Sequence, residues 1–212
     1  MGAYSSFAQD FPLRCRKLLE EQSLSKLDME VTIMLSVASS GFTMPFERLR
    51  PVDKKPDYED VERLKKARKQ MNILLGKKFI GSTVWPLSDA SSWLHRKEVE
   101  SVKGDPNQWP ELYDGKSTIV GRDVHSILAH LRNALAHGNI LTLGNPIDKI
   151  IFLSRYRDEH GCLTDKFNML AVTSSDLRKF LLNWFTFLAT LNIPEAPDQE
   201  TVIDLLHYDD KD

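Results

Sequence analysis

The sequence has few cysteines, no long apolar run and little net charge, and each shortage excludes a class of protein. Its 212 residues include two cysteines, Cys15 and Cys162. They are too few and too far apart for a disulfide framework or a zinc site. No run of about 18 apolar residues suggests a membrane span. No basic segment followed by an apolar core resembles a secretory signal at the N-terminus, so a cytoplasmic location is expected.

The overall composition is that of a folded protein without an excess of positive charge. Hydrophobic residues make up 42% of the chain and charged residues 27%, and the formal net charge is −2. A chain of this length can bury a core without disulfides or metal. We expect one domain over residues 1–212, with a basic and irregular insertion at about 48–118 and an acidic tail from about 195. The tail could add a short helix at Thr201–His207.

Hydrophobic periodicity predicts a mainly α fold, a bundle of four to five helices with a small β-hairpin before the last helix. Pro12 interrupts the first helix early, so that helix could instead begin there. The last helix follows Thr173-Ser-Ser-Asp176, a capping-box pattern. The helices are expected at Ser5–Gln22, Leu27–Ser40, about 61–75, Gly121–His137 and from Thr173 towards Pro194, and the hairpin strands at Lys149–Tyr156 and Cys162–Val172.

The middle of the chain is the least regular part. Residues 76–116 contain three prolines and three of the four tryptophans, Trp85, Trp93 and Trp109. A long irregular segment can conceal a short helix, which we place at Ser88–Val102. The tryptophans could stack on nucleic-acid bases, but packing in a core or at a subunit interface is favoured.

Positive charge is concentrated in one segment. Residues 48–78 hold eleven Lys and Arg against five Asp and Glu. Two interpretations stay open: a solvated helix face, or a local patch that attracts phosphate. On the second interpretation the RNA-binding residues are Arg63, Lys65, Lys66, Arg68 and Lys69.

The residues with the clearest chemistry lie near the end of the helix predicted at Gly121–His137. On a helical wheel His130, Asn133 and His137 share one face opposite the apolar stripe, and Arg132 flanks that stripe. An imidazole can transfer a proton at neutral pH, an Arg can bind a phosphate through two hydrogen bonds, and an Asn can orient either group. In RNA the 2′-hydroxyl is a built-in nucleophile, so such a set could cleave a phosphodiester without a metal.

The stretch Arg132-Asn133-Ala-Leu-Ala-His137-Gly138 also resembles the Arg-x4-6-His signature of HEPN domains (higher eukaryote and prokaryote nucleotide-binding). The opening residues around Phe7–Phe11 and Met29–Leu35 are similar to those of a bacterial, plasmid-associated branch of HEPN nucleases. In that branch a hairpin and an Asp-Leu-Arg helix start follow the signature, which Asp176-Leu177-Arg178 matches. A different subclass continues the signature with His-x-Tyr, and this chain has Gly138-Asn139 there.

The resemblance implies a helical bundle that pairs as a homodimer, with two signature helices lining one cleft. It implies that Arg132 binds the scissile phosphate, that His137 acts as general base or acid, and that Asn133 is a supporting contact. Such nucleases use no cofactor or metal and act in toxin–antitoxin systems or antiviral defence, so an antitoxin or defence partner is possible.

Three functions are therefore weighed. The leading one is a metal-independent endoribonuclease; the alternative is a non-catalytic HEPN module that binds RNA or nucleotide or serves as a dimerisation scaffold. A metal-dependent hydrolase is disfavoured, because the sequence has no His-x-x-x-His, no Cys-x-x-Cys and no convincing carboxylate cluster. His125 and His130 are predicted to have no direct role, and His160, in the predicted turn, to be solvated.

Overall fold

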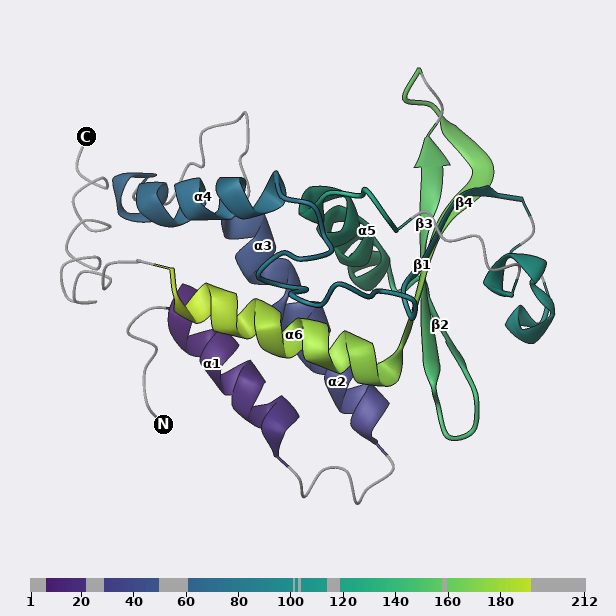
Figure 1. Ribbon diagram of the computed structural model, residues 1–212, viewed down its shortest axis with the longest axis horizontal. Coiled ribbons are helices and arrows are strands. Elements are labelled where there is room, and N and C mark those ends of the chain that lie inside the picture. Colours follow the sequence, from purple (N-terminus) through teal and green to yellow (C-terminus); the bar gives the residue numbers. More distant parts are fainter. Residues whose placement is uncertain are drawn as a thin grey trace, which may run out of the picture.

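Helices form one side of the molecule and an antiparallel sheet forms the other (Figure 1). The computed structural model describes residues 7–21, 29–49, 61–100, 102, 104–113, 119–157 and 160–191. The helices are α1 (Phe7–Glu20), α2 (Glu30–Gly41), α3 (Thr43–Leu49), α4 (Val61–Leu75), α5 (Val124–His137) and α6 (Ser174–Ala189). The strands are β1 (Leu94–Val99), β2 (Ile140–Leu143), β3 (Lys149–Arg157) and β4 (Leu163–Thr173), with short 3₁₀ turns η2 (Pro106–Gln108) and η3 (Pro110–Leu112).

The predicted helices are present, with small differences at their ends. α1 continues through Pro12, which is buried inside the helix rather than at its start. α2 ends at Gly41 as expected, but a further short helix, α3, follows after one residue and contains Pro45. Gly41 lies where α1 and α2 approach closely, because a Cβ there would be 2.7 Å from the Cys15 sulfur. The predicted helix at Thr201–His207 lies outside the described residues.

The small hairpin is corrected to a larger sheet. Strand order is β1-β4-β3-β2, and every neighbouring pair is antiparallel. The two segments expected to form a hairpin are the central strands, β3 and β4, and β1 and β2 extend the sheet on either side. β1 occupies the segment for which we predicted a helix at Ser88–Val102, so that prediction is wrong.

The sheet buries both of its faces. One face supplies Ile150, Phe152, Leu170 and Val172 to the main core beneath the helices. The opposite face packs with Trp109 and Leu112 from the 3₁₀ turns in a second apolar cluster. The helical bundle and the sheet are therefore joined by a continuous core.

The tryptophans of the middle segment belong to these cores. Trp85 and Trp93 are 1% and 0% exposed. Trp85 stacks on Phe79, and Trp93 contacts Trp85, Phe79 and Phe180 of α6 edge-on. Trp109 is 3% exposed. Packing in a core is confirmed for all three, and none presents a ring to stack on a base.

The Asp-Leu-Arg start of α6 connects three elements. The N-cap hydroxyl of Thr173 accepts from the backbone N–H of Asp176, as the capping-box pattern predicts. Asp176 accepts a short hydrogen bond from the Ser92 hydroxyl before β1. Arg178 donates to the carbonyl of Leu19 in the last turn of α1, 2.5 Å away. This motif therefore fastens α6 to the sheet and to the end of α1.

Candidate functional site

Helix α5 is the platform of the site, and both of its ends are fixed by local sequence. The Asp123 carboxylate accepts from the backbone N–H of Ser126 at 2.7 Å and caps the N-terminus. Gly138 ends the helix in the left-handed region with φ 65°, a conformation that favours glycine. The chain then turns directly into β2, so the last turn of α5 is held against the sheet.

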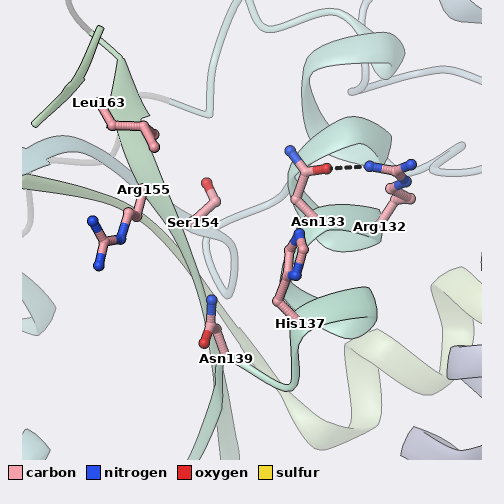
Figure 2. Close-up of a pocket in the computed structure, with 7 residues that line it drawn as sticks. All are labelled: Arg132, Asn133, His137, Asn139, Ser154, Arg155 and Leu163. Carbon is pink, nitrogen blue, oxygen red and sulfur yellow. Dashed lines mark hydrogen bonds between the residues drawn. The ribbon is translucent and has the colours of Figure 1, made fainter.

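The polar residues at the end of α5 line a pocket between this helix and β3. The pocket has a volume of about 490 Å³, and its helix side is formed by Arg132, Asn133 and His137. In Figure 2 Asn133 and His137 lie on the side of α5 that faces the strand. The structure thus brings the three residues of the predicted signature to one pocket.

Arg132, however, directs its guanidinium elsewhere. Its Nε lies 2.5 Å from the Glu47 carboxylate of α3, and its Nη1 donates to the Asn133 side-chain oxygen at 2.8 Å. Figure 2 shows the guanidinium on the side of Asn133 away from β3. Because five residues rotate a helix by about 140°, one helix does not aim Arg132 and His137 at the same point. Glu47 gave no signal in the sequence, since it is one acid among many and its partner is 85 positions away.

His130 is not on an exposed face. It is 6% exposed, and its Nε2 lies 2.9 Å from the Phe152 carbonyl of β3. A carbonyl only accepts, so Nε2 is the protonated nitrogen. Burial lowers the pKa of His130 to about 4, despite the opposing effect of the hydrogen bond to Phe152. The sheet covers this part of α5, which a helical wheel cannot show.

His95 of β1 lies beside His130 in the same buried layer. The two rings are 5.9 Å apart and nearly perpendicular. Burial, with a smaller contribution from the nearby His130 and Arg122, lowers the pKa of His95 to about 3. This pair could not be predicted, because nothing in the sequence shows that residues 95 and 130 meet.

The strand side of the pocket consists of residues that no sequence motif marks. They are Asn139, Ser154, Arg155 and Leu163. Ser154 lies on the helix-facing side of β3, and its hydroxyl is 3.5 Å from Nδ1 of His130. Figure 2 shows the Arg155 guanidinium on the other side of the strand. None of the described residues that line the pocket is acidic.

The predicted basic patch lies on a different helix, α4. Lys65, Lys66 and Lys69, called here the α4 lysines, are exposed, and the buried side of the helix packs on the core. Arg68 donates to the Arg48 carbonyl at 3.2 Å, whereas the side chain of Arg63 lies outside the described residues. α5 lies between α4 and the sheet in Figure 1, and none of the described side chains of α4 lines the pocket.

Within the described ranges, no group of three or more His, Cys, Asp or Glu is placed to hold a metal ion. In the same ranges, no helix has the length and apolar character needed to cross a bilayer.

Comparison with known proteins finds one family. A family model described as HEPN pEK499 p136 matches residues 1–195. The match extends from the first helix through α6 and includes the pocket. No curated protein and no solved structure matches the chain significantly.

Proposed function

The chain belongs to the HEPN pEK499 p136 family, and we propose that it is a metal-independent endoribonuclease. One observation carries this proposal: Asn133 and His137 project from the end of α5 into a pocket that no described acidic side chain lines. Such a pocket suits an anionic backbone, because a carboxylate beside a phosphate would repel it. In RNA the 2′-hydroxyl can attack its own phosphate, so no metal-activated water is required.

His137 is the proton-transfer residue. It removes the proton from the 2′-hydroxyl, whose oxygen then forms a bond to phosphorus while the bond from phosphorus to the 5′-oxygen breaks. The products are a 2′,3′-cyclic phosphate and a 5′-hydroxyl, which takes up a proton as it leaves. His137 is exposed, and in the described part of the chain its imidazole has no hydrogen-bond partner, so it is available to the substrate.

Arg132 stabilises the negative charge on the phosphate. Its ion pair with Glu47 is partly exposed, with the side chains 28% and 31% accessible. Ion pairs of this kind contribute about 1 kcal/mol or less. A phosphate that accepts two parallel hydrogen bonds from the guanidinium can therefore compete with Glu47.

Self-association completes the site. Within one copy, Arg132 and His137 point in directions about 140° apart on the helix. In a homodimer that pairs two α5 helices about a two-fold axis, the guanidinium of one copy can bind the phosphate at which the imidazole of the other copy transfers a proton. The second copy can also supply the acid that protonates the leaving 5′-oxygen.

The biological setting we propose is a toxin–antitoxin system or antiviral defence, in which an antitoxin or defence partner restrains the nuclease.

The α4 lysines contribute affinity rather than chemistry. They are exposed on a helix beside α5 but outside the pocket. RNA that extends beyond the cleaved linkage would reach them, and each phosphate they neutralise adds to the salt dependence of binding.

Cleavage of single-stranded RNA in EDTA tests the proposal. Wild type is expected to cut and to leave 2′,3′-cyclic phosphate ends, and Arg132→Ala and His137→Ala are each expected to lose at least about a hundredfold in rate. His125→Ala is the matched control, because His125 lies on the same helix with an exposed side chain that does not line the pocket. Wild-type rates in folded, dimeric Arg132→Ala and His137→Ala would refute the assignment, as would a requirement for a divalent ion.

A non-catalytic HEPN module that binds RNA or nucleotide, or that serves as a scaffold, is the second candidate. The observation that favours it is the Arg132–Glu47 ion pair, which holds the guanidinium away from His137. RNA binding by wild type without cleavage would establish this candidate. Dimerisation without RNA binding would leave only the scaffold.

A further inference from the structure

The strand side of the pocket has no part in the proposed chemistry, yet it carries polar groups that face it. Asn139 stands between α5 and β2, and its backbone is fixed: its N–H donates to the Ala134 carbonyl and its own carbonyl accepts from Leu153. Its exposed side-chain amide makes no hydrogen bond to any described residue. A rigid backbone therefore presents a free donor and acceptor at the pocket.

Ser154 lies against the buried histidine layer. Because Nε2 of His130 donates to the Phe152 carbonyl, Nδ1 of the neutral ring carries a lone pair. The Ser154 hydroxyl, 3.5 Å from Nδ1, is the group that can donate to it. This contact is long for a hydrogen bond, so the Ser154 hydroxyl can turn and either donate to a ligand or accept from it.

Leu163 supplies an apolar surface to the same pocket. It is the first residue of β4 and is 54% exposed, although it is a large aliphatic side chain. An aliphatic group beside a hydroxyl matches a flat ring with a polar edge, and the Asn139 amide at the other end of the pocket can bond to the attached sugar or phosphate. The pocket volume of about 490 Å³ also lies within the range of small-ligand sites, about 300–1,000 Å³.

We propose that Asn139, Ser154 and Leu163 form a subsite for one unpaired nucleotide of single-stranded RNA, next to the linkage at His137. The base packs on Leu163 and bonds to Ser154, and Asn139, at the other end of the pocket, bonds to the sugar or phosphate of the same nucleotide. Proteins that recognise single strands read splayed-out bases in this way, whereas the bases of an A-form duplex are stacked and cannot enter such a pocket. This inference rests on the proposed function, because it takes RNA as the ligand, and it makes the strand side of the pocket the source of single-strand preference.

Binding of a non-cleavable RNA tests the subsite without any need for catalysis. The probe is a fluorescent single-stranded oligonucleotide with 2′-fluoro sugars and mixed sequence, compared by anisotropy with the same strand annealed into a duplex. Wild type is expected to prefer the single strand. Asn139→Ala and Ser154→Ala are each expected to weaken single-strand binding about 2- to 13-fold, as expected for the loss of one hydrogen bond of about 0.5–1.5 kcal/mol. Duplex binding should change less than about twofold.

Two further variants separate a ligand contact from loss of structure. Ser154→Thr keeps the hydroxyl on a strand and should bind as wild type does. Ser39→Ala removes a hydroxyl that bonds to the Leu35 carbonyl on α2, outside the pocket, and should also have no effect. Equal weakening by Ser154→Thr and Ser154→Ala would overturn the assignment of the hydroxyl as a ligand contact.

The outcomes distinguish this inference from the proposed function. Unchanged binding by both alanine variants, with active wild type, overturns the subsite and leaves the nuclease standing. Weakened binding by those variants, with wild type that never cleaves, supports the subsite and overturns catalysis. Failure of wild type to bind single-stranded RNA overturns both.

Discussion

Acidification from pH 7 to pH 5 is expected to destabilise the fold by about 4 kcal/mol through two buried imidazoles. Burial, the largest cause, lowers the pKa of His95 to about 3 and that of His130 to about 4 from an ordinary value of 6.5. Between pH 4 and pH 6.5 the unfolded chain therefore binds protons that the folded chain does not. Stability then rises with pH through this window and levels off above it.

The magnitude follows from the same values. At pH 5 an imidazole with a pKa of 6.5 is almost fully protonated, whereas one with a pKa of about 4 is mostly neutral. The difference destabilises the folded state by about 2 kcal/mol for each of the two histidines. A domain has a free energy of unfolding of about 5–15 kcal/mol, so the combined effect is a large part of the total.

Urea unfolding at pH 7 and pH 5, followed by tryptophan fluorescence, measures the loss. His95→Phe fills the same buried space without a titrating group and should lose about 2 kcal/mol over this interval, against about 4 kcal/mol for wild type. His125→Gln, an exposed histidine on the same helix as His130, should behave as wild type does. Carboxylates that titrate near pH 5 cancel in these differences. Equal losses in wild type and His95→Phe would refute the reasoning.

Three other changes have defined outcomes. Glu47→Gln releases Arg132 from its ion pair and should tighten binding of the non-cleavable single-stranded RNA up to about fivefold, the equivalent of about 1 kcal/mol. Unchanged or weaker binding would contradict the idea that Glu47 restrains Arg132. Gly41→Ala places a methyl group 2.7 Å from the Cys15 sulfur and should lower the free energy of unfolding by about 1–3 kcal/mol, measured in urea; wild-type stability would mean that α1 moves aside freely. Charge reversal of the α4 lysines should weaken RNA binding and make the binding constant less dependent on salt concentration. An unchanged salt dependence would mean that these lysines form a solvated helix face and do not contact RNA.

The helices could be predicted because their signals are local. Apolar residues at helical spacing, the Asp123 and Thr173 caps and the Gly138 stop act within a few residues of one another. β1 was missed for the opposite reason. Its sequence, Leu-His-Arg-Lys-Glu-Val, is mostly charged or polar, as suits an edge strand, and contains a bulge with Glu98 at φ 57°. What makes it a strand is its pairing with β4, about 70 residues later in the chain.

The candidate site divides in the same way. The spacing of Asn133 and His137 could be obtained from the sequence, because helix geometry alone puts them on one face. The burial of His130 could not, since it depends on a sheet assembled from distant segments. Glu47 and Ser154 could not be found either, as each matters only through a contact with α5 that the sequence does not encode locally.

The sheet also changes what a signature helix can do. An Asn and a His on the outer face of an isolated helix end are open to water, and a solvated pair binds a phosphate only weakly. In this protein β3, together with Asn139 just before β2, lies across that face and converts it into a pocket with a second wall. Because the wall is fastened through His130 to the core, its geometry is set by the same buried contacts that hold the fold together.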